Sequence, residues 1–194
     1  MTVLYSGSFN PLHIGHLAIL KALCGRKDVA RVLLSVSPQN PLKETPASVS
    51  AQARFEAAQA ALARHPELSK VEACDIELRL PPPHYTINTL DCLSHLLSTD
   101  GEQEDKARET GRLMLAVGGD QLADFRRWKD YTRILLDYGL LVYPREGFDS
   151  RALRDDLLSE NPAYRILLLD APEINISSTF LRSGAVEDME KYLM

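Results

Sequence analysis

Apolar and polar residues along this chain form two alternating kinds of segment. Short, strongly apolar runs are typical of buried strands, and the clearest of them span residues 2–5, 30–36, 113–117, 140–143 and 164–169. Longer segments with a helical pattern lie between them, over residues 50–65, 86–97, 128–137 and 151–160. Strands alternating with helices of this length predict βαβ units, so we expect one doubly wound α/β domain over residues 1–194, with a largely parallel sheet and helices on both faces.

Composition narrows the class of partner. The 194 residues suit a single domain, 45% are hydrophobic and 25% are charged, as in a soluble globular protein. The formal net charge of −5 does not favour a nucleic-acid partner, and no apolar stretch is long enough to cross a bilayer. The three cysteines are scattered and no signal peptide opens the chain, which predicts a cytoplasmic protein. The oligomeric state is left open.

Two segments depart from the regular pattern. Residues 37–48 contain three prolines, and we expect a mobile loop beyond the second strand. Residues 98–110 are charged and lack apolar periodicity, which predicts a solvated connection.

The run from Gly7 to His16, G-S-F-N-P-L-H-I-G-H, directly follows the first strand. Parallel sheets bind ligands at the carboxyl ends of their strands, and a glycine such as Gly7 lets a phosphate approach the main chain. We expect a helix to begin near residues 12–14, where its free N–H groups favour an anion. His13 and His16 are spaced to share one face, where they can donate to phosphates or, if protonated, take up charge.

Parts of this run also have simpler interpretations. A histidine taken alone is more often an ordinary surface or core residue. A zinc pair usually has i, i+4 spacing and needs further ligands, which the neighbouring sequence lacks. The complete run after a strand is more specific than any of its parts, and it favours a nucleotide site.

A second element lies near the other end of the chain, where I-S-S-T-F-L-R spans residues 176–182. Hydroxyl groups at a helix start can cap the helix and donate to phosphate oxygens, and Arg182 offers a planar fork to a pyrophosphate. Such a run taken alone is more often only a helix cap.

Three elements in the middle of the chain carry further candidates. In P-H-Y-T-I-N-T-L, from Pro83, Thr86 is placed to cap a helix, and in G-G-D-Q, from Gly118, Asp120 can accept from ribose hydroxyls or an adenine amino group. Trp128, the single tryptophan, lies among Arg126, Arg127 and Lys129. A lone tryptophan is more often a packing residue, but this one could stack on a flat ring beside an anion.

These motifs resemble those of the H-x-G-H adenylyltransferases, which carry an I-S-[ST]-T-x-x-R element where this chain has residues 176–182. The resemblance implies a Rossmann-like nucleotidyltransferase fold in which both motif histidines contact ATP phosphates, the second with the larger share of transition-state stabilisation. Ser8 and Asn10 stand where many relatives have glycine and aspartate. Asn10 keeps the size and the acceptor oxygen of an aspartate but loses its charge.

The middle elements look like those of the bacterial nicotinate-nucleotide adenylyltransferases, with a Y-T-x-x-T-L stretch, a G-x-D turn and a following tryptophan. By that resemblance the backbone around Tyr85 and Thr86 holds the nicotinate carboxylate and Trp128 stacks on the pyridine ring. Lys43, in a loop that also resembles the family's, approaches a phosphate. The similarity runs from Thr2 to about Gly184, whereas relatives usually continue into a further helix, so we expect a truncated or differently capped member.

The implied reaction transfers AMP from ATP to nicotinate mononucleotide, with Mg²⁺ arriving on the ATP. Alternatives are transfer to nicotinamide mononucleotide or to phosphopantetheine, an inactive nucleotide-binding regulatory module, and metal-dependent hydrolysis. The catalytic candidates are His13, His16 and Arg182. The ATP-binding candidates are Gly7, Ser8, Phe9, Asn10, Lys43, Gly119, Asp120, Ser177, Ser178 and Thr179; the acceptor-binding candidates are Tyr85, Thr86 and Trp128.

Overall fold

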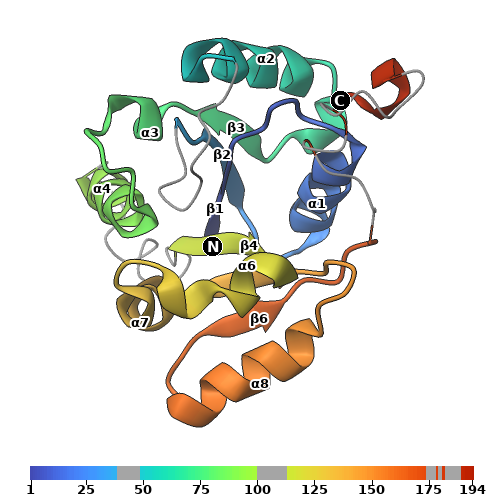
Figure 1. Ribbon diagram of the computed structural model, residues 1–194. Coiled ribbons are helices and arrows are strands. Elements are labelled where there is room, and N and C mark those ends of the chain that lie inside the picture. The colour runs from blue at the N-terminus through green and yellow to red at the C-terminus, as the bar shows by residue number, and fades with distance from the viewer. Residues whose placement is uncertain (39–48, 100–112, 174–177, 179–180, 182–188) are drawn as a thin grey trace.

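A six-stranded parallel sheet in the order β3-β2-β1-β4-β5-β6 forms the centre of the protein (Figure 1). The structure is a computed structural model that describes residues 1–38, 49–99, 113–173, 178, 181 and 189–194. The strands are β1 (Thr2–Gly7), β2 (Arg31–Val36), β3 (Val71–Cys74), β4 (Leu113–Gly118), β5 (Leu140–Tyr143) and β6 (Ile166–Leu168). The two irregular segments of the sequence fall mainly on residues 39–48 and 100–112, which lie outside the described residues.

The five strands expected from the apolar runs are confirmed, and the parallel sheet with them. The sequence did not reveal β3, a four-residue edge strand that pairs only with β2 among the described strands. Its sequence V-E-A-C alternates polar and apolar residues because an edge strand is only partly covered, and Glu72 is exposed. So short an alternation is a weak signal by itself.

Helices connect the strands. The longer ones are α1 (Ile14–Gly25), α2 (Ala51–Ala63), α4 (Thr86–Thr99) and α8 (Ser150–Glu160). The shorter ones are α3 (Ile76–Arg79), α6 (Gly119–Ala123) and α7 (Tyr131–Arg133); α7 continues into a π-helical turn, η3 (Ile134–Tyr138), and 3₁₀ turns span Pro66–Leu68, Phe125–Arg127 and Met189–Tyr192. None of the described helices is long and apolar enough to span a membrane.

The helix expected over residues 128–137 was wrong at its start. Asp130 has a φ of 54°, in the left-handed region, and regular helix begins only at Tyr131. Asp130 is among the few residue types that tolerate this conformation, which ends the preceding turn before the helix can propagate.

Two apolar layers fix the helices on opposite faces of the sheet. Successive residues of a strand point to opposite faces, so Val3 and Tyr5 join one cluster and Leu4 joins the other. Side chains of α1 and α2 complete the first cluster, and those of α4, η3 and α8 complete the second. The predicted doubly wound architecture is therefore confirmed.

The order of the strands places β1 between β2 and β4, where the chain direction across the sheet reverses. Crossovers on either side of such a point diverge, which leaves a crevice outside the carboxyl ends of the strands. The run Gly7–His16 begins at this point, directly after Tyr5 and Ser6.

Candidate nucleotide site

His13 and His16 together cap the N-terminus of α1. His13 is the N-cap residue, and its Nδ1 accepts a hydrogen bond from the Gly15 amide at 3.2 Å, while Nδ1 of His16 accepts from the His13 amide at the same distance. The two ring centroids lie 3.7 Å apart. The helix predicted to begin at residues 12–14 is confirmed, and the spacing of the histidines is that of a reciprocal capping box.

This capping decides which nitrogen of each neutral ring carries the proton, and burial keeps both rings neutral. A ring nitrogen that accepts from an amide carries no proton, so in each neutral imidazole the N–H lies on Nε2. Both side chains are buried, and burial lowers the pKa of His13 to about 4 and that of His16 well below its usual range. The nearby charge of Arg145 lowers both pKa values further. The pair therefore offers two neutral N–H donors, and the expectation that protonated rings take up charge is not supported near neutral pH.

The loop between β1 and α1 has its unusual backbone at Phe9 rather than at Gly7. Gly7 is the last residue of β1 and pairs with Val36, whereas Phe9 has a φ of 41°. The Phe9 ring packs edge-on against Tyr5 at 5.3 Å and His16 at 5.1 Å between centroids. A Cβ at Gly7 would lie 3.0 Å from this ring, so Gly7 makes room for Phe9.

One hydroxyl joins the second sequence element to this loop. Ser178 Oγ donates to the Pro11 carbonyl at 3.0 Å across 167 positions of sequence. The two motifs from opposite ends of the sequence thus meet beyond the carboxyl end of β1. The other candidates of that element, Ser177, Thr179 and Arg182, lie outside the described residues, as does Lys43.

The last described residues of the chain also contact the loop between β1 and α1. Leu193 forms an isolated antiparallel bridge with His13, and the Met194 amide donates to the Leu12 carbonyl at 3.4 Å. The Met194 main-chain oxygen accepts from Arg64, the C-cap residue of α2, at 2.5 Å. The backbone of Leu12 and His13 is therefore held by Met194 and Leu193, in addition to the bond from Ser178 to Pro11.

A second set of candidate site residues lies at the carboxyl ends of β4 and β5. Gly118 caps α6, and Gly119, the first residue of α6, lies so close to α8 that a Cβ would be 2.6 Å from Ser150 Oγ. The exposed carboxylate of Asp120 forms an ion pair with Arg145 at 3.7 Å. Arg145 also lies over the Tyr143 ring, 5.2 Å from its centroid. Sequence reasoning missed Arg145, although its position just after a strand end was the available signal.

Tyr85 and Thr86 lie at the start of α4. Thr86 is the first helical residue, and the Tyr85 carbonyl accepts from the Asn88 amide at 3.0 Å. The cap expected at Thr86 was therefore wrong by one residue, because Tyr85 occupies the capping position. The amides of the first turn face the end of the helix, as binding of a carboxylate there would require.

Trp128 lies against the second apolar cluster, with its ring 4.9 Å from that of Phe125. It is partly buried, so it packs against the core, while its stacking on a ligand ring stays a prediction. The cations around it are paired with carboxylates: Arg126 with Asp156 and Glu160, Arg127 with Asp124, and Lys129 with Asp130. These pairs weaken the expectation of an anion site beside the tryptophan.

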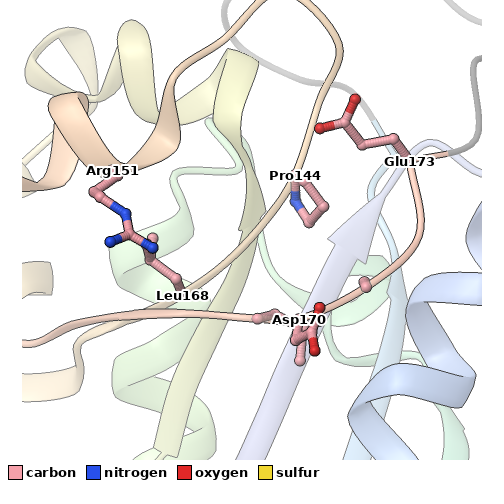
Figure 2. A pocket seen from close by; sticks show the side chains of 7 residues that line it. Pro144, Arg151, Leu168, Asp170 and Glu173 are labelled. Atoms are coloured by element: carbon pink, nitrogen blue, oxygen red, sulfur yellow. The ribbon is translucent and has the colours of Figure 1, made fainter.

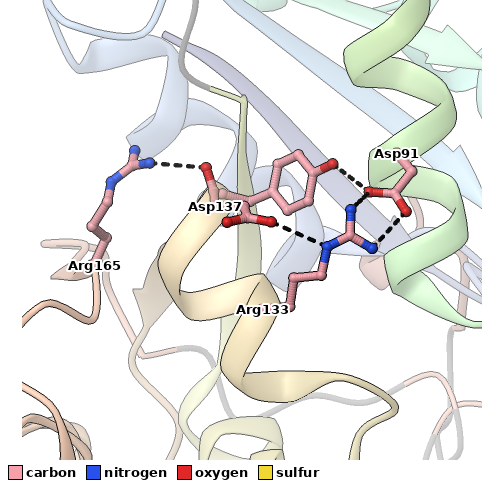
Figure 3. Close-up of polar contacts among 5 residues, drawn as sticks. Asp91, Arg133, Asp137 and Arg165 are labelled. Carbon is pink, nitrogen blue, oxygen red and sulfur yellow. Dashed lines mark hydrogen bonds and ion pairs between the residues drawn. The ribbon is translucent and has the colours of Figure 1, made fainter.

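The helix that starts at Thr86 is tied to the helix that follows Trp128. Arg133 of α7 donates through both terminal nitrogens to the Asp91 carboxylate of α4, at 2.9 and 2.6 Å (Figure 3). Tyr138 Oη donates to the same carboxylate at 2.5 Å, and Arg133 Nε donates to Asp137 at 3.1 Å. We call the Asp91–Arg133 pair the α4–α7 clasp. It fixes the spacing of the two elements expected to hold the acceptor.

A buried carboxyl group lies beneath the ends of β1 and β2. Glu77 of α3 is 4% exposed and accepts from Ser6 Oγ at 2.5 Å. Burial raises its pKa, while the hydroxyls of Ser6 and Ser37 oppose the rise. Sequence reasoning did not single out Glu77, because nothing local distinguishes it from a surface glutamate.

A pocket of about 400 Å³ opens at the carboxyl ends of β5 and β6 (Figure 2). Pro144 and Asp170 follow the two strands, Arg151 comes from the first turn of α8, and Glu173 lies further along the loop that holds Asp170. None of these residues was among the sequence candidates. No cluster of three or more potential metal-ligating side chains occurs within the part of the chain that the structure describes.

A six-stranded parallel sheet with its capped helix at the reversal of strand order defines the doubly wound α/β class. Residues 4–184 match the cytidylyltransferase-like family. A probable nicotinate-nucleotide adenylyltransferase of Cytophaga hutchinsonii is 36% identical over 180 residues, which cover 93% of this chain and 83% of the relative. Another, from Porphyromonas gingivalis, is 36% identical over 96% of this chain and 85% of its own length.

Solved structures agree on the fold. Plasmodium falciparum nicotinic acid mononucleotide adenylyltransferase complexed with NaAD superposes with a TM-score of 0.73 at 16% identity, covering 99% of this chain and 89% of that one. The chain therefore belongs to the cytidylyltransferase-like family and groups with the nicotinate-nucleotide adenylyltransferases, which confirms the resemblance seen in its motifs.

Proposed function

We propose that this protein is an enzyme of NAD biosynthesis that transfers AMP from ATP to nicotinate mononucleotide, giving nicotinate adenine dinucleotide and pyrophosphate. The observation that carries this proposal is the pair of neutral histidines whose rings cap the N-terminus of α1, in a chain 36% identical to probable nicotinate-nucleotide adenylyltransferases over nearly its whole length. We also propose a cytoplasmic location, which the three free cysteines favour.

The chemistry needs no base from the protein. An oxygen of the mononucleotide phosphate attacks the α-phosphorus of ATP, a new phosphoanhydride bond forms, and the bond from that phosphorus to the bridging oxygen breaks as pyrophosphate leaves. The second pKa of such a phosphate is about 6, so the nucleophile is already a dianion at neutral pH. Catalysis then consists of positioning and of stabilising charge on the phosphate oxygens.

The ATP side of the site follows from the capped helix. The Nε2–H groups of His13 and His16 donate to phosphate oxygens, and the free amides of α1 add the partial positive charge of a helix N-terminus. The guanidinium of Arg145 lies close enough to influence both rings and contributes positive charge. Gly7, Ser8, Phe9, Asn10 and Ser178 line the same loop region in this proposal, and Gly119 and Asp120 take the nucleoside.

Candidates outside the described residues complete the proposal. Lys43, Ser177, Thr179 and Arg182 are assigned to the phosphates from their motifs alone. Magnesium enters as part of the MgATP substrate. On the acceptor side, the first amides of α4 near Tyr85 and Thr86 hold the nicotinate carboxylate, and Trp128 stacks on the pyridine ring.

A pyrophosphate-release assay tests the reaction. With MgATP, nicotinate mononucleotide should support turnover, and nicotinamide mononucleotide and phosphopantetheine should be much poorer acceptors in competition. Equal or faster turnover of the amide would overturn the choice of acceptor. Binding of ATP with no release for any acceptor would favour a regulatory module, and release without an acceptor would favour hydrolysis.

A further inference from the structure

Arg54 of α2 is a buried arginine whose partners come from three separate segments. The residue is 3% exposed. Nη1 donates to the carbonyls of Ser8 at 2.5 Å and Ser37 at 2.9 Å, Nη2 donates to that of Pro38 at 3.1 Å, and Nε to that of Val49 at 3.2 Å. One guanidinium thus joins the loop after β1 to the end of β2 and to the residue before the Ser50 cap of α2.

The charge of this side chain is not matched by a carboxylate. All four partners are main-chain carbonyls, and among the described residues Arg54 has no ion pair. Burial lowers its pKa, but an arginine stays protonated at neutral pH. Burying a cation without a counter-ion is costly, and the four hydrogen bonds to carbonyls offset that cost. The position of the cation beside the proposed ATP loop suggests a second role.

The bond to Ser8 constrains the residue that follows. The peptide between Ser8 and Phe9 is trans, so its carbonyl and its N–H point in opposite directions. With the carbonyl drawn to Arg54, the Phe9 N–H faces away from α2. Phe9 has a φ of 41°, a conformation that is unfavourable for such a residue unless its surroundings hold it. Arg54 holds it from one side, and the packing of the Phe9 ring against Tyr5 and His16 from the other.

We propose that Arg54 is a positioning residue of the phosphate site: it fixes the Ser8–Phe9 peptide so that the Phe9 N–H points at an ATP phosphate, and its unmatched charge strengthens that site. This inference rests on the proposed function, which places ATP at residues 7–16. Arg54 itself touches only main-chain carbonyls of the protein.

The decisive variant is Arg54→Lys, which keeps the charge and most of the volume but loses the planar fork that reaches four carbonyls. Arg31→Lys is the matched control, because Arg31 forms an exposed pair with Glu72 at the opposite end of β2. The Michaelis constants for MgATP and nicotinate mononucleotide, the melting temperature and the affinity for a non-hydrolysable ATP analogue should be measured for both variants and the wild type.

We expect Arg54→Lys to fold and to raise KM for MgATP about tenfold or more, with KM for the mononucleotide within about twofold of wild type, and Arg31→Lys to behave as wild type. A second variant, Arg54→Ala, leaves a guanidinium-shaped space. Added guanidinium at millimolar concentration should restore its ATP affinity, while the same concentration of urea, similar in shape but uncharged, should not.

An unchanged KM for MgATP in a folded Arg54→Lys would overturn the proposal. So would an equal rise in both Michaelis constants, because a merely structural role predicts it. If the wild type binds the ATP analogue but turns over no mononucleotide, the proposed function fails. The ratio of analogue affinities between wild type and Arg54→Lys then still decides the role of Arg54: a tenfold loss supports it and an equal affinity refutes it.

Discussion

The ring of His16 supports the backbone of His13, and the ring of His13 supports the backbone of Gly15, in one reciprocal arrangement at the start of α1. Under the proposed function, each imidazole therefore has two separable tasks. Its Nδ1 holds the helix end, and its Nε2–H is left to donate to a ligand. Substitutions that mimic one nitrogen at a time can distinguish the structural task from the catalytic one.

His16→Asn should lose activity while keeping its fold. The amide oxygen of asparagine replaces Nδ1 as the acceptor for the His13 amide, but no donor remains at the Nε2 position. We expect kcat to fall about 10²–10³-fold, the usual effect of removing one preorganised donor, with little change in melting temperature.

Two further variants control this experiment. His16→Gln keeps a donor near Nε2 and loses the cap, so it should melt earlier but retain more activity than His16→Asn. His65→Ala removes a partly buried histidine whose ring pairs with Glu67, outside the proposed site, and should leave kcat unchanged. Wild-type kcat in His16→Asn would show that the Nε2–H does not act on the transition state.

Acid should destabilise the protein partly through His13. Its pKa is about 4 when folded and about 6.5 when unfolded, so between these values the unfolded chain binds the extra proton. This contribution to stability is complete above pH 6.5 and is lost as the pH falls toward 4, on the order of 3 kcal/mol in total.

His13→Asn isolates that contribution, because asparagine can cap a helix and does not titrate. Free energies of unfolding measured at pH 7.5, 5.5 and 4.5 should fall less steeply for the variant than for the wild type. The same slope in both proteins would mean that His13 is not buried in its neutral form.

Breaking the α4–α7 clasp should affect the acceptor more than the fold. The Asp91–Arg133 pair is partly exposed, and such pairs contribute about 0–1 kcal/mol to stability. Because the clasp joins the helix of Thr86 to the helix that follows Trp128, Asp91→Asn should raise KM for nicotinate mononucleotide several-fold and leave KM for MgATP near its wild-type value.

Asp137→Asn is the matched control. It removes another carboxylate from Arg133, but one that lies on the same stretch of chain rather than on α4. Equal effects of the two variants on KM for the mononucleotide would argue that the clasp does not set the acceptor site.

Trp128 gives a direct optical test of the acceptor site, since it is the only tryptophan. Stacking on a pyridine ring should quench its fluorescence when nicotinate mononucleotide is added, and MgATP alone should not. Trp128→Phe should keep more affinity than Trp128→Ala, because a smaller aromatic ring can still stack. A titration that saturates catalysis without changing the fluorescence would contradict the stacking.

The fold was accessible from the sequence because its signals are local. The strand at Val3 and Leu4 is predicted by a run of apolar residues, and the helix at Ala51–Ala63 by the helical pattern over residues 50–65. β3 was missed because its stability comes from pairing with β2. That contact is distant in sequence, and a four-residue pattern does not predict it. The start of α7 was misplaced because one left-handed residue, Asp130, overrides the helical pattern around it.

Only part of the candidate site could be predicted from the sequence, because only some of its residues belong to local motifs. His13 and His16 belong to a contiguous motif, and Ser178 to a second one, so their association could be expected. Arg54 and Glu77 resemble surface residues in sequence, and only the folded chain shows that one is surrounded by carbonyls and the other by hydroxyls.

The hydrogen bond from Ser178 to Pro11 has a consequence for the order of events during synthesis. The histidine loop emerges from the ribosome among the first residues, and the hydroxyl that meets it follows 167 positions later. Its strand, β1, likewise lacks one neighbour until β4 is made. Contacts so distant in sequence form late. A partly synthesised chain thus carries the histidine loop before the residue that binds its backbone has been made, and the candidate site is complete only in the finished fold.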